Sequence, residues 1–190
     1  MARRRARDES ATRARFVAGD VFSPGLRLDR FDVVYARSVL SHLATPEAAV
    51  AQMAKLIGAE GCVVLDDIDI GTVWTDPPSA AYDRINQLFV GLVTSYGAQP
   101  DTGSRLEGML SAAGLSDVRT VVEQPILCEG LGKRYWELTF AETVPAMLDA
   151  GVVSRQEAED LLRAIRPFAE DPAVSVALPR RIVATGVAGS

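Results

Sequence analysis

The chain has little cysteine and histidine and no long apolar run. Among its 190 residues there are two cysteines and one histidine. Cys62 lies inside an apolar run and Cys128 in a different segment without CxxC spacing, so neither a disulfide nor a metal site is implied. No apolar run approaches the roughly 20 residues that cross a bilayer, and the arginine-rich N-terminus lacks the apolar core of a secretory signal. We therefore expect a cytoplasmic protein without a membrane span.

The overall charge is acidic, whereas the N-terminus is basic. The net charge is −5 and the pI is about 5.0, which argues against a general nucleic-acid-binding role, because such binding needs a basic face. Six arginines nevertheless fall within residues 3–15, a pattern that leaves open an arm docking on phosphate. The alternative is a solvated helix over residues 2–9, since no aromatic side chain lies among the arginines to stack on bases.

Three short apolar runs end in small or acidic residues, and the segment between the last two has helical periodicity. The runs cover residues 16–18, 31–35 and 62–65. The run at 31–35 is nearly continuous, which is typical of a strand covered on both faces. Thr45 and Pro46 then predict the start of a helix that continues to residue 57. Strand, helix and strand at this spacing predict a βαβ crossover with parallel strands, and thus an α/β fold.

The rest of the chain is mainly helical. With 48% hydrophobic and 24% charged residues, it has the composition of one globular domain. Ser154, with Glu157 three positions later, is a capping-box signal for the last helix. The expected helices cover residues 80–95, 104–113, 136–150 and 154–169, and the expected strands cover residues 118–122 and 181–187.

These stretches resemble the class I S-adenosylmethionine-dependent methyltransferases, in particular the small-molecule methyltransferases of the ubiquinone and menaquinone biosynthesis type. Residues 16–20, Phe-Val-Ala-Gly-Asp, are similar to the family's third strand with its Gly-Asp ending. The remaining matches are residues 31–43 with the fourth strand and its loop, 46–65 with the helix and fifth strand, 103–115 with the helix before the sixth strand, and 181–186 with the last strand. The resemblance implies a Rossmann-like sheet in one domain, residues 1–190, with a helical cap over residues 131–170. It also implies S-adenosyl-L-methionine as cofactor and methyl transfer to a small-molecule substrate.

The sequence departs from the family at its beginning. The family opens with a strand ending in a Gly-x-Gly loop that cradles the cofactor and a second strand ending in an acid, and neither precedes residue 16. We therefore expect an N-terminally truncated domain in which the strand at 16–18 has no neighbour and the strand at 31–35 is an apolar edge. Such an edge predicts a homodimer or a strand-exchanged oligomer. The alternative to an enzyme is a non-enzymatic remnant or partner subunit that associates through this edge.

The resemblance assigns cofactor contacts near the first two strands. Asp20 would accept a hydrogen bond from the adenine amino group, and Val21 would pack on the ring; the alternative for Asp20 is a turn residue. Ala36 would let the cofactor approach the end of the next strand. Arg37 would pair with the cofactor carboxylate or a substrate anion, or else form a surface ion pair with a neighbouring aspartate.

His42 and a cluster of aspartates are the candidates for chemistry. A histidine with a pKa near neutrality can serve as general base for the substrate proton, although a lone histidine can also be a loop or core residue. Alternation places Asp67 and Asp69 on one face of their strand and Asp66 on the other. Because this divides the cluster, we expect no metal site, and instead a polar strand end with Asp67 or Asp69 facing the substrate.

Four aromatic residues are candidates for the substrate pocket. Trp74, Tyr82, Tyr135 and Trp136 would line an apolar pocket under the helical cap, and the alternative is that they are ordinary core residues. Methyl transfer mainly requires that acceptor and donor be aligned in a dry site. The absence of a recognisable catalytic triad is thus compatible with this function, and the sequence does not name the acceptor.

Overall fold

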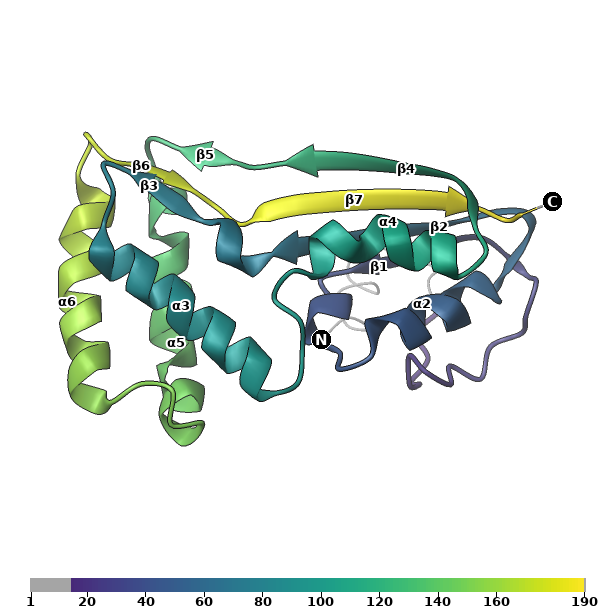
Figure 1. The fold of residues 1–190 in the computed structure, drawn as a ribbon, viewed down its shortest axis with the longest axis horizontal. Coiled ribbons are helices and arrows are strands. Elements are labelled where there is room, and N and C mark those ends of the chain that lie inside the picture. The colour runs from purple at the N-terminus through teal and green to yellow at the C-terminus, as the bar shows by residue number, and fades with distance from the viewer. Residues whose placement is uncertain (1–14, 190) are drawn as a thin grey trace.

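A four-stranded sheet forms one half of the molecule in the computed structural model, which describes residues 15–189 (Figure 1). The strands follow the order β1-β2-β7-β4. Their bounds are β1 Phe31–Arg37, β2 Ile57–Asp69, β7 Arg180–Val187 and β4 Ser116–Glu123. β1 and β2 are parallel and are connected through helix α2 (Pro46–Ala54), whereas β7 is antiparallel to both β2 and β4. The predicted βαβ crossover and α/β class are confirmed.

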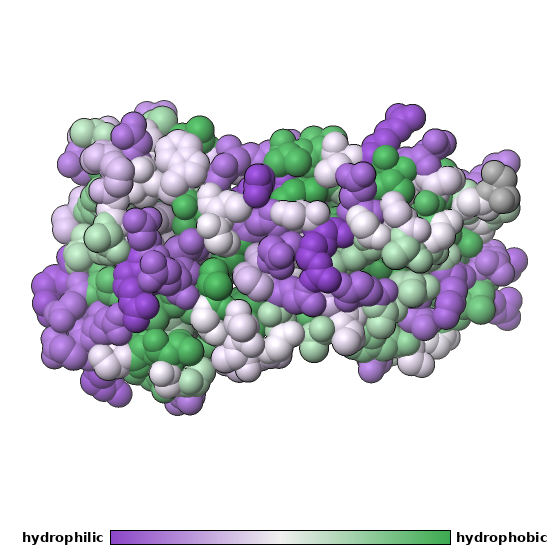
Figure 2. Space-filling model, viewed as in Figure 1, coloured by the Kyte–Doolittle hydropathy of each residue, from purple (hydrophilic) through white to green (hydrophobic). Residues whose placement is uncertain are grey.

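Two helices cover one face of this sheet. Helix α4 (Thr102–Ala112) contacts β2 and β7, and α2 packs beside it. Side chains from both layers form a buried core cluster that includes Val50, Leu65, Leu106 and Ile182. On this side of the molecule hydrophilic and hydrophobic residues are interspersed, and the hydrophobic ones form small separate groups (Figure 2).

The opposite face of the sheet is open among the described residues. Val33, Tyr35 and Val121 are exposed to between 55% and 58%, whereas Ala36, whose side chain faces the helices, is buried. The expectation that the strand at 31–35 is covered on both faces is therefore wrong. The apolar run alone could not show that β1 is exposed, because a strand at the edge of a sheet can be as apolar as a central strand.

The other half of the molecule is built from three helices and a small sheet. Helices α3, α5 and α6 gather at one end of the molecule (Figure 1) around a second core cluster that includes Phe140, Met147 and Ile165. The helices are α3 Ala80–Ser95, α5 Tyr135–Asp149 and α6 Arg155–Glu170, and the strands, in the order β3-β6-β5, are β3 Trp74–Asp76, β6 Ser175–Ala177 and β5 Ile126–Leu127. α5 and α6 follow β5 and precede β6 in the chain. The start of α6 is as predicted, since the Ser154 hydroxyl accepts the Glu157 N–H at 3.2 Å.

The segment before β1 differs from the prediction. Residues 16–18 do not form a strand, because no described strand lies beside them to pair with their backbone groups. The expected helix over residues 2–9 and the arginines from Arg3 to Arg13 lie outside the described residues. Within residues 15–189, no helix is long and apolar enough to span a membrane.

Two glycines of α4 provide a matched test of how closely this helix approaches the sheet. A Cβ at Gly103 would lie 2.5 Å from Ile182 Cδ1 and 2.9 Å from Asp69 Oδ1, whereas a Cβ at Gly108 would meet no atom within 4 Å. We expect Gly103→Ala to lower the free energy of unfolding by about 1 to 3 kcal/mol through overpacking. Gly108→Ala should raise it by about 0.5 to 1 kcal/mol, because alanine favours the helix. Urea unfolding of both variants measures the difference, and a loss of stability in both would contradict the assigned packing.

Candidate functional site

Three buried aspartates at the carboxyl end of β2 organise the site. Asp66, Asp67 and Asp69 are each no more than 3% exposed. As the alternation predicts, Asp66 lies on the open face of the sheet, and Asp67 and Asp69 lie on the face that carries the helices. Each carboxylate is bound by groups of the protein itself, and each holds a different segment of the chain next to β2.

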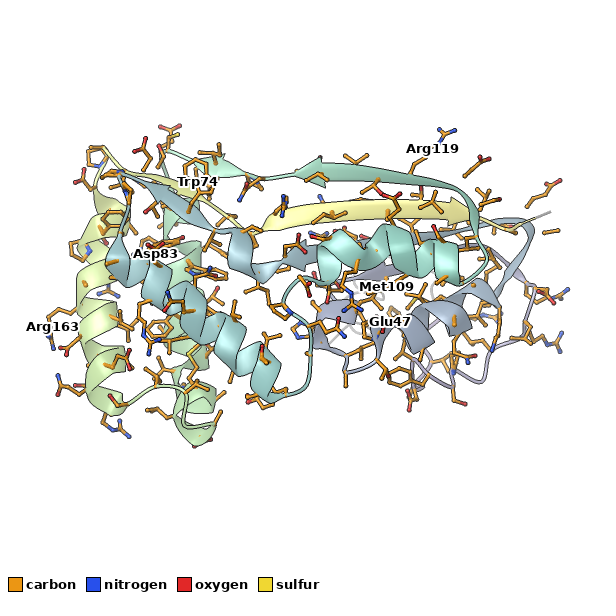
Figure 3. The ribbon with its side chains drawn as sticks, in the orientation of Figure 1. Glu47, Trp74, Asp83, Met109, Arg119 and Arg163 are labelled. Carbon is orange, nitrogen blue, oxygen red and sulfur yellow. The ribbon has the colours of Figure 1, made fainter. Side chains whose placement is uncertain are left out.

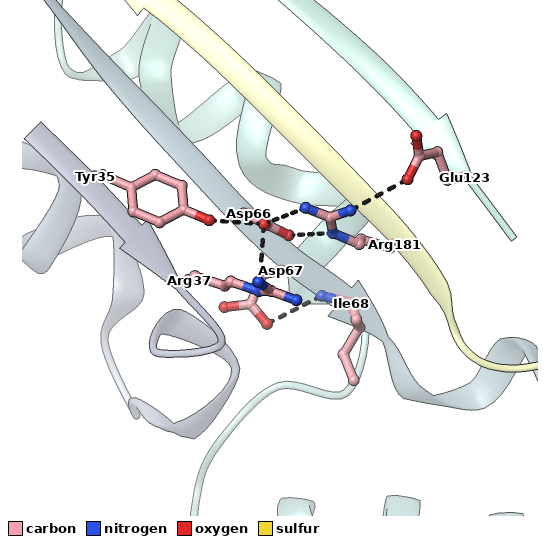
Figure 4. A network of polar contacts seen from close by, with 7 residues as sticks. All are labelled: Tyr35, Arg37, Asp66, Asp67, Ile68, Glu123 and Arg181. Carbon is pink, nitrogen blue, oxygen red and sulfur yellow. Dashed lines mark hydrogen bonds and ion pairs between the residues drawn. The ribbon is translucent and has the colours of Figure 1, made fainter. Parts of the chain in front are cut away.

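Asp66 is the centre of a polar network on the open face (Figure 4). Arg181 donates to both of its oxygens, from Nε at 2.7 Å and from Nη2 at 2.5 Å, and the Tyr35 hydroxyl donates at 2.9 Å. Arg37 Nε lies 3.6 Å from the same carboxylate, and Arg181 Nη1 also donates to Glu123 at 3.2 Å. The network joins β1, β2, β7 and β4 across the sheet.

The charges in this network stabilise one another. Hydrogen bonds from Arg181 are the main reason that the pKa of Asp66 is lowered, and burial opposes them. The hydrogen bond to Asp66 raises the pKa of Tyr35 and, with the opposite charge, that of Arg181. Asp66 is therefore an anion at neutral pH whose oxygens are already occupied. The Arg37 side chain is 62% exposed.

Asp67 fixes the loop that follows β1. One of its oxygens accepts the N–H groups of Leu40 at 2.9 Å and Ser41 at 3.2 Å, and the other accepts that of Ile68 at 3.0 Å. Leu40 opens the short helix η1 (Leu40–His42), whose last residue is His42. His42 is exposed, and its position depends on this buried anchor. A general-base role for His42 stays a prediction.

Asp69 fixes the start of α4 in the same way. It accepts the Ser104 backbone N–H at 2.8 Å and the Ser104 hydroxyl, and Arg180 Nη2 lies 3.4 Å away. A carboxylate near the N-terminus of α4 also interacts favourably with the positive end of the helix dipole. Because its oxygens are used within the fold, a contact between Asp69 and the substrate stays a prediction.

The expected cofactor residues are divided between the surface and the core. Asp20 is exposed, and its carboxylate accepts the Phe22 N–H at 2.9 Å, which is the turn geometry left open by the sequence. Val21 packs against the core of α2, α4 and the sheet, and Ala36 lies within that core. Arg37 combines an exposed guanidinium with the ion pair to Asp66 that was its alternative interpretation.

The four aromatic candidates lie at the helical end of the molecule. Trp136 is 4% exposed and its ring centroid lies 4.5 Å from that of Phe89, and Tyr82 is 1% exposed. Both therefore belong to the core, as their alternative interpretation states, and burial raises the pKa of Tyr82. Trp74 on β3 and Tyr135 are 40% and 50% exposed (Trp74 is labelled in Figure 3). Only these two remain available to a ligand.

Residues 15–189 contain no group of three or more histidine, cysteine, aspartate or glutamate side chains that could hold a metal ion. Cys62 and Cys128 are both free thiols.

Sequence reasoning missed Tyr35, Arg181 and Glu123. Alternation along β1 could have placed Tyr35 and Arg37 on one face. The pairing of β2 with β7, which brings Arg181 to Asp66 across 115 positions of sequence, has no local signal.

Comparison with known proteins shows similarity to methyltransferases. Residues 1–65 match the family model described as "Methyltransferase domain". Methyltransferase str3 of Strobilurus tenacellus is 33% identical over 110 residues, which are 55% of this chain and 38% of that protein. The chain thus spans less than half the length of this curated relative.

Two solved structures share the fold. The YcgJ protein of Bacillus subtilis superposes with a TM-score of 0.61 at 17% identity, over 100% of this chain and 77% of that chain. Phosphoethanolamine N-methyltransferase 2 of Haemonchus contortus, in complex with phosphomonomethylethanolamine and S-adenosylhomocysteine, superposes with a TM-score of 0.54 at 13% identity, over 98% of this chain and 40% of that chain. This chain therefore has the fold of these two structures, and its first 65 residues match a methyltransferase family model.

Proposed function

We propose that this chain takes part in transferring a methyl group from S-adenosyl-L-methionine to a small-molecule acceptor. The proposal rests on two features at the carboxyl end of β1: the exposed guanidinium of Arg37, its last residue, and the anchored loop after it, which ends in His42. Open α/β sheets bind ligands outside the carboxyl ends of their strands. The match to a methyltransferase family model supports the same assignment.

The described residues fit the cofactor in part. Arg37 offers guanidinium donors to a carboxylate, and the exposed Asp20 offers an acceptor to an amino group. Ala36 lies in the core, so its contribution is limited to leaving space at the strand end. When bound, the cofactor supplies a methyl group already activated on a positively charged sulfur.

The part assigned to His42 is to accept the proton that the acceptor loses. Its imidazole is exposed, and a histidine side chain can serve as a general base. Trp74 and Tyr135 are proposed to contact the acceptor's apolar part, and Asp69 its polar part. Helices α5 and α6, within the proposed cap of residues 131–170, would shield the acceptor from water.

The proposed partners are a small molecule and a second polypeptide. The alternative, a partner subunit without activity of its own, is less favoured because it assigns no role to the exposed Arg37 and the anchored His42. The cytoplasmic location expected from the sequence belongs to the same proposal.

Calorimetric titration with S-adenosylhomocysteine, the demethylated cofactor, tests the cofactor site. We expect binding by the chain and an affinity about tenfold weaker for Arg37→Gln, since a charged hydrogen bond is worth about 1.5 kcal/mol or more. Arg163→Gln is the matched control, because the Arg163 side chain is 72% exposed and lies on α6. Its affinity should equal that of the unmodified chain.

Two results would contradict the proposal. One is the absence of heat with the unmodified chain at high micromolar concentration. The other is an equal loss of affinity in Arg37→Gln and Arg163→Gln, which would remove Arg37 from the site.

A further inference from the structure

Three segments of the chain cross from the four-stranded sheet to the helical end of the molecule. They connect β2 with β3, β4 with β5, and β6 with β7. The pairing of β2 with β7 ends at Asp69 and Arg180, and the pairing of β3 with β6 begins at Trp74 and Ala177. The short helix η2 (Ile70–Thr72) lies between these two pairings. The strand pairing is therefore interrupted at the crossing.

The side chain of Gln124 links all three crossing segments. It lies between β4 and β5, and its amide nitrogen donates to the carbonyl of Thr72 at 2.7 Å and to that of Leu178 at 3.1 Å. An amide group with two N–H donors can serve both acceptors. Pro125 and Pro179, in two of these segments, have no N–H, which limits the backbone hydrogen bonds available there.

Two further hydrogen bonds support the same arrangement. The Leu178 N–H donates to the Pro125 carbonyl at 2.9 Å, and the Arg180 N–H donates to the Thr72 hydroxyl at 2.7 Å. Each of these bonds joins two segments, whereas the Gln124 amide joins three. Thr72 is held both through its carbonyl and through its side chain.

The segment that Gln124 holds is part of the support of the helical end. Helix α3 contacts η2, and Ile70 and Val73 belong to the buried cluster of the helical end. Trp74, which follows directly, is 40% exposed. A displacement of Thr72 would therefore move the helical end and Trp74 relative to the sheet.

We propose that Gln124 is a positioning residue, whose amide sets how the helical end lies relative to the carboxyl ends of β1 and β2. This inference rests on the proposed function, in which Trp74 and Tyr135 of the helical end contact the acceptor and Arg37 contacts the cofactor. Methyl transfer requires that acceptor and donor be aligned, and a misplacement of about 1 Å can cost about a hundredfold in rate. Gln124 acts through the two carbonyls that it binds and not by touching either ligand.

Distances between spin labels test this role. Arg119 on β4 and Arg163 on α6 lie at opposite ends of the molecule (Figure 3), and both are exposed. With Arg119→Cys and Arg163→Cys labelled, and with alanine in place of Cys62 and Cys128, double electron–electron resonance gives the distribution of distances between the sheet and the helical end. Gln124→Met, which has a side chain of similar length without the amide, should shift or broaden this distribution.

The matched control is Gln156→Met. Gln156 is exposed, and its amide donates to Asp160 within the same helix at 3.2 Å, so this variant should leave the distribution of distances unchanged. Calorimetry with S-adenosylhomocysteine should give the same affinity for Gln124→Met as for the unmodified chain, because the proposed contact of Arg37 with the cofactor lies on the sheet.

Two results would overturn the proposal: a distribution in Gln124→Met equal to that of the unmodified chain, or an equal change in Gln156→Met. Where Gln124→Met does not fold, Gln124→Asn replaces it. This variant keeps the amide on a side chain one methylene shorter, so it should give a smaller shift, and no shift would overturn the proposal. Absence of S-adenosylhomocysteine binding by the unmodified chain would contradict the proposed function, and the distances would still decide whether Gln124 sets the arrangement of the two halves.

Discussion

Replacing Asp66 with alanine is expected to lower the free energy of unfolding by about 3 kcal/mol. Asp66 is buried and binds Arg181 through two hydrogen bonds and Tyr35 through a third. Removing one partner of a buried ion pair leaves the other partly desolvated and uncompensated, at a cost of about 3 to 5 kcal/mol. The lower end applies because Arg181 and Arg37 both reach solvent. Urea unfolding at pH 7 provides the measurement.

The matched control for Asp66 is Asp160→Ala. Asp160 pairs with Arg163 at 2.8 Å, but the two side chains are 52% and 72% exposed, and such surface pairs contribute little. Its unfolding curve should coincide with that of the unmodified chain. If both aspartate variants lose the same stability, the network around Asp66 does not support the fold as described.

The same carboxylate should make stability depend on pH. The pKa of Asp66 is lower in the folded chain than in the unfolded one, where it is about 3.9. Its contribution is therefore fully present above about pH 4 and is lost as the pH falls through the folded value. In unfolding curves recorded between pH 7 and pH 2.5, the stability difference between the unmodified chain and Asp66→Asn should shrink below pH 4. A constant difference would contradict this assignment.

Replacing Asp67 with alanine is expected to cost about 2 to 3 kcal/mol and to release the loop after β1. The change removes the acceptor of three backbone N–H groups at a position that is 1% exposed. A buried donor left without a partner costs about 1 to 3 kcal/mol, and the loop can recover part of this loss by moving to water. Urea unfolding gives the energy, and hydrogen exchange at Leu40 and Ser41 should show the loop opening.

Asp67→Asn is the conservative comparison. Its amide oxygen can still accept from Leu40 and Ser41, so exchange at these two amides should lie between that of the unmodified chain and that of Asp67→Ala. If Asp67→Ala leaves the exchange of both amides unchanged, Asp67 does not anchor η1. The position of His42 would then need another explanation.

Most long elements of the fold could be predicted from sequence, and the short strands could not. The start of β2 is an exception, because the helix expected to continue to residue 57 ends at Ala54 and β2 begins at Ile57. Apolar periodicity over residues 80–95 and the cap at Ser154 located α3 and α6, because each signal is complete within its own segment. β5 and β6 contain two and three residues, too few for alternation to stand out. Residues 16–18 have the composition of a strand but lack a neighbour.

For the site, the directions of the side chains could be predicted from sequence, and their binding partners could not. Alternation correctly separated Asp66 from Asp67 and Asp69, because side-chain direction along a strand is local. What each carboxylate binds depends on contacts between distant segments, such as Arg181 on β7 and Ser104 on α4. We expected Asp67 or Asp69 to face a substrate, and the sequence did not indicate that backbone N–H groups donate hydrogen bonds to both carboxylates.

The two core clusters have a consequence for cooperativity. No buried residue belongs to both clusters within the described part of the chain, and β2 and β7 extend from the sheet toward the helical end. Units with separate cores can open with different free energies. We therefore regard the α3-α5-α6 end and the sheet as two folding units, coupled at Asp69 and Arg180, where the antiparallel pairing of β2 with β7 ends. Opening of the helical end would expose Trp136 while leaving the Asp66 network intact.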